Sequence, residues 1–127
     1  MKQVEKLIKA AKQASKFAYA PYSKFKVGAA IMTDKGKIYT GVNIENASYG
    51  LTVCAERVAI FKGISEGKKK FKAIAIYTNT KNFTAPCGAC LQVMQEFNPK
   101  LYVILINSKN EIKQYNLSSL LPHAFKF

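Results

Sequence analysis

All three cysteines of this chain lie in two short motifs, and these motifs constrain the fold more than any other feature. One is Cys54-Ala-Glu-Arg57, and the other is Pro86-Cys-Gly-Ala-Cys90. Three thiolates can bind a zinc ion and leave its fourth position open, whereas a structural zinc site is closed by four protein ligands. A fold that brings the two motifs together would therefore form a metal site with room for a water molecule.

Glu56 gives this site a possible catalytic group. One residue separates it from Cys54, so at the start of a helix its carboxyl group can lean over the open zinc position. There it can take a proton from zinc-bound water and return it to a substrate. The pattern predicts Cys54, Cys87 and Cys90 as zinc ligands and Glu56 as the acid/base.

Two other interpretations of the cysteines are weaker but stay open. A Cys-x-x-Cys pair can be a redox pair or half of a zinc ribbon. The redox interpretation leaves Cys54 and Glu56 without a role. The ribbon needs a fourth ligand, and the only histidine, His123, is far in sequence from the cysteines.

Length and composition favour a single globular domain over residues 1–127. Hydrophobic residues make up 49% of the 127 residues, which is ample for one core. No apolar run approaches the ~20 residues that span a bilayer. Residues 1–10 alternate lysines with apolar residues and show no signal-peptide core. An odd number of cysteines in motif spacing fits metal binding in a reducing compartment, so we expect a cytoplasmic protein without membrane association.

The chain is strongly basic, with a net charge of +13 from 20 basic and 7 acidic residues. Such a balance raises the question of nucleic-acid binding. Most lysines are dispersed, only residues 68–70 form a run, and Arg57 is the single arginine. A solvated lysine-rich surface is therefore the favoured interpretation, and nucleic-acid binding is a minority hypothesis on electrostatic grounds.

Periodicity and turn signals predict the order α-β-β-α-β-α-β-β-α. The expected elements cover residues 2–19, 27–33, 37–42, 53–65, 71–78, 87–97, 101–107, 111–115 and 117–121. This order fits a three-layer α/β/α sandwich with a five-stranded mixed sheet, in which the strands at 71–78 and 101–107 run parallel. The polar loop at 43–50 either lines a pocket or is only a solvated turn.

In this arrangement both cysteine motifs lie at helix N-termini, where backbone N–H groups stabilise thiolates. Arg57 can donate to the cysteine sulfurs and offset their charge. The alternative for Arg57 is a surface cation, which we favour less.

The chain resembles the small homotetrameric cytidine deaminases over nearly its whole length. The resemblance rests on residues 18–30, 41–50, 54–57, 86–90 and 120–125. It implies a cytidine deaminase-like fold and one Zn²⁺ per chain. It also implies hydrolysis of cytidine and deoxycytidine to uridine and deoxyuridine in pyrimidine salvage. In that reaction zinc-bound hydroxide attacks C4 while Glu56 shuttles protons.

The same resemblance implies the contacts to the substrate. Asn43 and Glu45 match the pair that holds the ribose 3′-hydroxyl, and Phe25 matches an aromatic residue that packs on the base. The backbone of Ala55 and of residues near Pro86 is expected to contact the polar edge of the pyrimidine.

Subunit contacts are implied as well. Phe125 matches a tail residue that reaches the active site of a neighbouring subunit, and Tyr49 belongs to the same region. The resemblance thus implies a homotetramer with active sites at subunit interfaces. From the sequence alone, Phe125 can equally anchor the tail on its own core.

Two other functions compete with this one. An enzyme with the same zinc motifs can act on cytidine within a polynucleotide or on another aminated heterocycle. The Asn43 and Glu45 pair argues for a free 3′-hydroxyl, since a chain phosphate there would face a carboxylate. The third hypothesis is a non-enzymatic basic nucleic-acid-binding module with structural zinc, in which Glu56 has no catalytic purpose.

Overall fold

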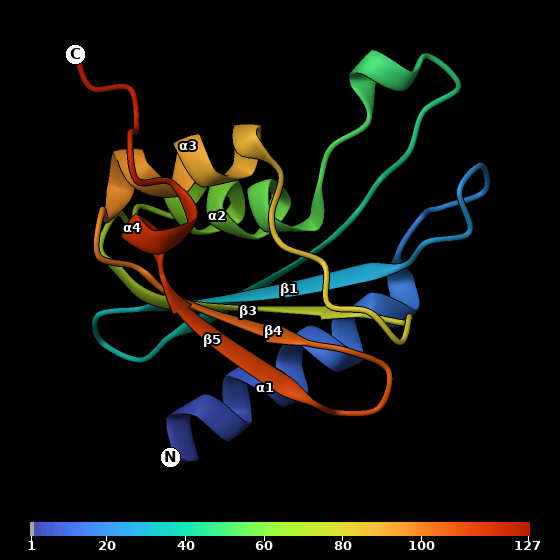
Figure 1. Ribbon diagram of the computed structural model, residues 1–127, viewed down its shortest axis with the longest axis horizontal. Coiled ribbons are helices and arrows are strands. Elements are labelled where there is room, and N and C mark those ends of the chain that lie inside the picture. The colour runs from blue at the N-terminus through green and yellow to red at the C-terminus, as the bar shows by residue number, and fades with distance from the viewer. Residues whose placement is uncertain (1) are drawn as a thin grey trace.

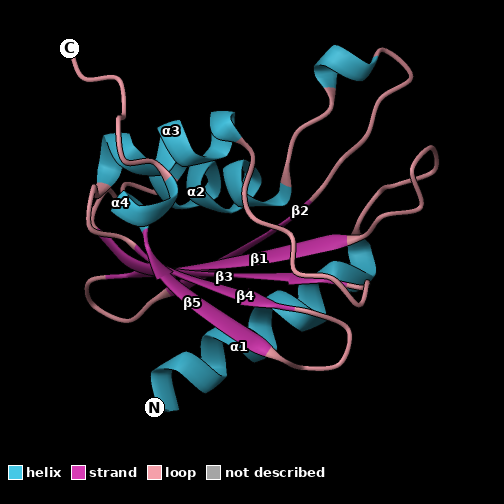
Figure 2. Cartoon of the chain, in the orientation of Figure 1, coloured by secondary structure: helices cyan, strands magenta, loops and turns pink. Residues whose placement is uncertain are grey.

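The computed structural model describes residues 2–127 and shows one sheet with helices on both faces (Figures 1 and 2). The helices are α1 (Lys2–Ala14), α2 (Ala55–Ser65), α3 (Gly88–Phe97) and α4 (Leu117–Leu120), and the short 3₁₀ helices are η1 (Ser15–Phe17) and η2 (Tyr49–Leu51). The strands are β1 (Val27–Thr33), β2 (Ile38–Val42), β3 (Phe71–Thr78), β4 (Tyr102–Ile106) and β5 (Ile112–Asn116). The predicted order of helices and strands is confirmed.

The sheet has the strand order β2-β1-β3-β4-β5. Strands β3 and β4 pair in parallel, and the other neighbouring pairs are antiparallel. Helix α3 lies in the crossover between β3 and β4, so the predicted parallel crossover and mixed sheet are confirmed. Figure 1 shows α2 and α3 side by side on one face of the sheet and α1 on the other.

Each face of the sheet carries its own hydrophobic core. Alternate residues of β4 divide between them: Val103 and Leu105 join the core under α2 and α3, and Ile104 and Ile106 join the core under α1. This division follows from the pleat, which directs successive side chains to opposite faces. Strand β4 is therefore covered on both sides, as its continuous apolar sequence predicted.

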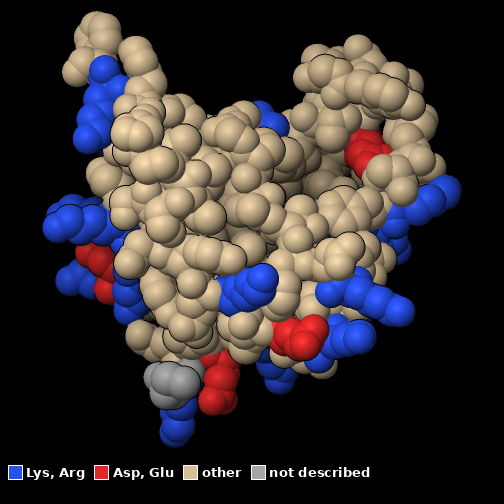
Figure 3. Space-filling view, viewed as in Figure 1, with Lys and Arg blue, Asp and Glu red and all other residues tan. Residues whose placement is uncertain are grey.

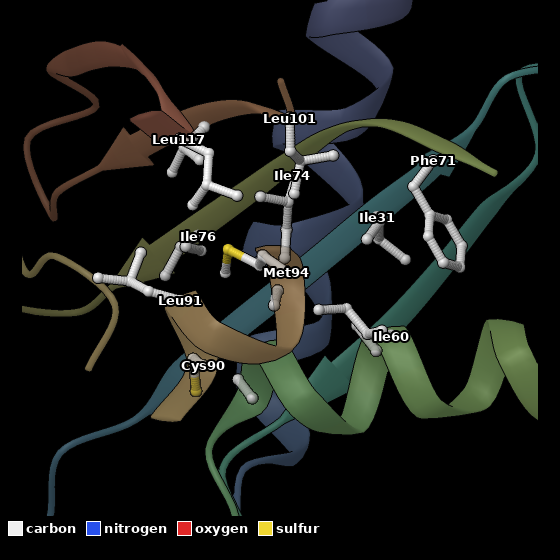
Figure 4. Close-up of a cluster of buried hydrophobic side chains, with 14 of the residues drawn as sticks. Ile31, Ile60, Phe71, Ile74, Ile76, Cys90, Leu91, Met94, Leu101 and Leu117 are labelled. Atoms are coloured by element: carbon white, nitrogen blue, oxygen red, sulfur yellow. The ribbon is translucent and has the colours of Figure 1, made fainter. Parts of the chain in front are cut away.

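The larger core reaches the second cysteine motif. Figure 4 shows Cys90 at the edge of the cluster that contains Met94 and Leu91, with its sulfur pointing away from the centre. Helix α3 thus anchors one side of the motif in the core and leaves the thiol free for another partner.

The first helix ends earlier than predicted. It was expected to continue to about residue 19, but α1 ends at Ala14 and one turn of 3₁₀ helix follows. The buried Ser15 hydroxyl donates to the Lys12 carbonyl at 2.7 Å, which favours a tighter turn. Strand β1 also crosses closely beneath this point, at Gly28.

We expect Gly28→Ala to destabilise the fold strongly. A Cβ atom at Gly28 would lie 2.7 Å from the Ser15 amide nitrogen and still closer to the Ala11 carbonyl oxygen. Because both neighbours are backbone atoms, α1 must move away from β1, and the free energy of unfolding should fall by about 3 kcal/mol. Urea unfolding would measure this. Gly50→Ala is the control, since no atom lies within 4 Å of its Cβ position. Equal stability of the two variants would contradict the expectation.

No helix within residues 2–127 has the length and apolar character that crossing a membrane requires.

Candidate active site

The two cysteine motifs meet at the N-termini of α2 and α3. Cys54 and Cys87 are the N-cap residues of these helices, and both have extended backbone conformations. Cys90 lies one turn into α3 and is buried. The Sγ atoms of Cys54 and Cys87 are 3.8 Å apart, and those of Cys87 and Cys90 are 3.6 Å apart.

The three thiols fit a zinc ion. At a Zn–S distance of about 2.3 Å, tetrahedral geometry places sulfur atoms about 3.8 Å from one another. In the described part of the chain, no fourth histidine, cysteine or carboxylate joins the group, whose sulfurs all lie within 4.8 Å of one another. This donor set suits an open zinc site. It argues against a closed ribbon, and the presence of Cys54 argues against an isolated redox pair.

Hydrogen bonds around these thiols favour the ionised form of Cys54, which is the form that binds a cation. A hydrogen bond from Cys90 is the main cause that lowers the pKa of Cys54 to about 5, and the Arg57 guanidinium adds to the effect. Nη2 of Arg57 donates to the Cys54 sulfur at 3.6 Å. The same hydrogen bond to Cys54, together with burial, raises the pKa of Cys90. The structure thus places the Arg57 guanidinium against the Cys54 sulfur.

Glu56 lies in the first turn of α2 and is buried. Burial raises the pKa of its carboxyl group to about 7, and the negative charge of Cys54 adds to this shift. A carboxyl group that titrates near neutral pH can both accept and give up a proton.

A cavity of about 310 Å³ connects the cysteines with the loop that follows β2. Of the residues predicted from the sequence, it is lined by Phe25, Asn43, Glu45, Cys54, Ala55, Glu56 and Cys87. Figure 3 shows this face of the molecule hollowed beside the projecting segment that carries η2, while the lysines spread around the periphery. The same cavity is thus lined by two metal ligands and by Asn43 and Glu45.

Asn43 is buried and holds the strand that enters the site. Its Oδ1 accepts a hydrogen bond from the Val27 amide at 2.9 Å, and its Nδ2 donates to the Phe25 carbonyl at 2.7 Å. These bonds tie the start of β1 to the end of β2 and place Phe25 on the cavity wall.

Five predicted residues do not line this cavity in the single chain: Cys90 and Arg57, described above, and Pro86, Tyr49 and Phe125. Pro86 is buried next to Cys87, but the wall is formed by its neighbours Thr84 and Ala85. Tyr49 is 75% exposed on η2 and packs edge-to-face with Tyr22 at 6.1 Å between ring centroids. Phe125 is 72% exposed, so it does not anchor the tail on its own core.

The structure also adds cavity residues that the motifs did not single out. Ser23, Thr52 and Thr84 line it. Each lies two positions from a predicted site residue, but short polar residues in loops carry no signal of their own. Only the tertiary contacts identify them.

An open three-thiolate metal site beside a buried carboxyl group, at one edge of an α/β/α sandwich, defines a zinc-dependent hydrolase. The comparisons with known proteins give the family. A sequence profile described as "Cytidine and deoxycytidylate deaminase zinc-binding region" matches residues 1–106. The chain belongs to this deaminase family, and its zinc is held by Cys54, Cys87 and Cys90.

Similar proteins support this assignment over the whole length. A cytidine deaminase of Sporosarcina psychrophila is 50% identical over 123 residues, which cover 96% of this chain and 90% of that protein. One from Halalkalibacterium halodurans is 52% identical over 120 residues and covers 94% and 91%. The crystal structure of cytidine deaminase from Burkholderia pseudomallei has a TM-score of 0.91 at 50% identity and covers 95% of this chain and 98% of that one. The cytidine deaminase-like fold is therefore confirmed.

Proposed function

We propose that this chain hydrolyses cytidine and deoxycytidine to uridine and deoxyuridine with release of ammonia, a reaction of pyrimidine salvage. The observation that carries the proposal is the single cavity that joins the cysteine ligands and Glu56 to Asn43 and Glu45. Relatives 50% and 52% identical to this chain are named cytidine deaminases. Residues 1–127 act as one catalytic domain, which the continuous sheet between its two cores supports.

Zinc bound by the three cysteines supplies a Lewis acid that activates water near neutral pH. Glu56 would take up a proton from the attacking water and deliver it to N3 of the pyrimidine. It would then take the remaining proton from the new hydroxyl at C4 and deliver it to the amino group, which leaves as ammonia while C4 becomes a carbonyl. Its burial beside Cys54 supports this role, because a desolvated carboxyl group exchanges protons readily near pH 7. Arg57 donates to Cys54 and moderates the negative charge of the ligands.

The remaining cavity residues orient the nucleoside. The base lies toward Ala55 and Glu56, with Phe25 packed against it and the backbone near Pro86 at its polar edge. The sugar lies toward Asn43 and Glu45, which hold the 3′-hydroxyl. Neither group requires a 2′-hydroxyl, so cytidine and deoxycytidine are both substrates.

Ultraviolet-monitored turnover of cytidine by the purified protein, with its zinc content measured in the same sample, tests the proposal. We expect the protein to contain about one zinc ion per chain. We expect the ultraviolet absorbance of cytidine to fall as the enzyme converts it to uridine. Zinc-loaded protein that leaves cytidine and deoxycytidine unchanged would overturn the substrate assignment. Deamination of an oligonucleotide at a comparable rate would show that a free nucleoside is not required.

The active form is a homotetramer with active sites at subunit interfaces. Exposed apolar side chains support this: Tyr49 and Leu51 lie on η2, next to the cavity residue Thr52, and Phe125 lies on the C-terminal tail. Isolated exposed apolar residues are ordinary, but large ones on two projecting segments suit an interface. The protein works in the cytoplasm, where its three thiols stay reduced and available to zinc.

We expect Phe125→Ala to lower kcat/KM for cytidine at least about tenfold, since a large buried interface aromatic contributes about 2 kcal/mol or more. Gln92 Nε2 donates a hydrogen bond to the backbone carbonyl of Phe125 at 3.0 Å. Because the substitution leaves this carbonyl in place, the tail of the variant should follow the same course. We would measure kcat/KM for cytidine, and the mass of the oligomer by light scattering, on the same preparation. Phe127→Ala, in the same tail, is the control. Unchanged activity in Phe125→Ala would show that the ring does not complete a neighbouring site.

A further inference from the structure

We propose that Ser23 is a positioning residue for sugar recognition: its hydroxyl holds the Glu45 carboxylate so that one oxygen faces the sugar hydroxyl. The inference rests on the proposed function, because it concerns how the same cavity selects its substrate. Ser23 lines the cavity that contains Glu56 and also a neighbouring cavity of about 380 Å³ next to Tyr22 and Tyr49. It therefore stands, with Glu45, in the wall between the two.

The hydrogen bonds of Glu45 leave one defined place for a ligand. Oε1 accepts from the backbone amides of Tyr22 at 3.0 Å and Ser23 at 3.1 Å. Oε2 accepts from the Ser23 hydroxyl. A carboxylate offers about four acceptor positions, two on each oxygen. The two amides use those on Oε1, so the remaining position is on Oε2, beside the Ser23 hydroxyl.

The Ser23 hydroxyl also acts as an acceptor. It receives the backbone N–H of Phe25 at 3.0 Å, across a turn in which Lys24 has a φ of 62°. The Phe25 carbonyl in turn accepts from Asn43 Nδ2 at 2.7 Å. One hydroxyl thus links the carboxylate expected to bind the sugar with the backbone of the residue expected to pack on the base.

The hydrogen bond from Ser23 helps to order the Glu45 side chain. Glu45 is only half-buried, and a free glutamate side chain loses considerable rotamer entropy when it is ordered. The hydrogen bond from Ser23 is the main cause that lowers the pKa of Glu45, which agrees with a direct contact between the hydroxyl and the carboxylate. Without the hydroxyl, the two backbone amides still bind Oε1, but Oε2 is free to turn away from the sugar.

Comparison of two substrates separates this role from a general structural one. We would measure kcat/KM for cytidine and for 3′-deoxycytidine, which lacks the sugar hydroxyl, in the wild-type enzyme and in Ser23→Ala. A hydrogen bond to a charged group predicts a loss of about tenfold for cytidine. The loss for 3′-deoxycytidine should stay below about twofold, because that substrate does not use Oε2.

Two further variants complete the kinetic design. Ser23→Thr keeps the hydroxyl and should restore most of the activity toward cytidine. Ser108→Ala, in the exposed turn between β4 and β5, is the control for removal of a serine hydroxyl. An equal loss for both substrates in Ser23→Ala, or no loss for either, would overturn the proposal.

A readout independent of turnover separates this proposal from the proposed function. Titration of the Glu45 carboxyl group by ¹³C NMR should show a higher pKa in Ser23→Ala than in the wild-type protein. An unchanged Glu45 pKa would show that the hydroxyl does not hold the carboxylate, whatever the enzyme deaminates. A wild-type protein that fails to deaminate cytidine but shows the NMR shift would overturn the proposed function and leave the Ser23–Glu45 contact established.

Discussion

Glu56→Gln should lower kcat for cytidine by at least about 10³-fold while zinc remains bound. Glutamine has nearly the same shape as glutamate, but it cannot take up and release a proton. General acid–base catalysis contributes about 10²–10⁴-fold for a single group, and Glu56 is proposed to serve more than one proton transfer. Because Glu56 is not a ligand in the three-thiolate site, the metal should stay in place.

The measurement combines steady-state turnover with zinc analysis of the same preparation. Glu66→Gln is the matched control, since Glu66 is exposed at the opposite end of α2 and should leave turnover and zinc content unchanged. If Glu56→Gln keeps activity within about tenfold of the wild type, Glu56 is not the proton shuttle. If it loses zinc, the carboxylate belongs to the metal site and the assignment of three ligands is wrong.

The second large effect is expected from Cys87→Ala. This residue supplies one of three thiolates, and its removal should reduce both bound zinc and cytidine turnover to near background. Cys87 is exposed, whereas Cys90 is part of the core, so Cys87 is the ligand whose loss should least disturb the packing. The variant should therefore stay folded by circular dichroism.

Chelation of the wild-type protein tests the same point without a mutation. Zinc that binds only the folded state stabilises it, so a chelator should lower the melting temperature of the wild-type protein and leave that of Cys87→Ala unchanged. Adding zinc back should restore both the melting temperature and turnover of the wild type. Stoichiometric zinc in Cys87→Ala, or full activity after chelation, would contradict the proposed ligand set.

The zinc site could be predicted from the sequence because each motif is local. Cys54, Glu56 and Arg57 fall within the first turn of one helix, and Cys87 and Cys90 within the first turn of another. Side chains so close in sequence have few possible relative positions once the helix forms. The same holds for the strands, whose apolar runs and turn residues place β1 and β3 at the predicted residues.

The part of the cavity that is proposed to hold the sugar was less accessible to sequence reasoning. Asn43 and Glu45 were assigned by resemblance alone, and Ser23 was not singled out. The contact between Ser23 and Glu45 joins residues 22 positions apart, in loops without periodicity. No local pattern specifies which loop residues meet across such a distance, because the packing of the surrounding strands and helices decides it.

The sequence by itself determined the ligand types, the candidate proton-transfer group and the order of the elements, since these depend on residue chemistry and on interactions within a few residues. The tertiary structure alone decided that the Sγ atoms of Cys54 and Cys87, which are 33 residues apart in sequence, lie 3.8 Å from each other. It did so by placing α2 and α3 side by side on one face of the sheet, where their N-termini converge. It also decided that Glu56 is buried and Phe125 exposed. Burial depends on which elements cover a side chain, and that is a property of the whole fold.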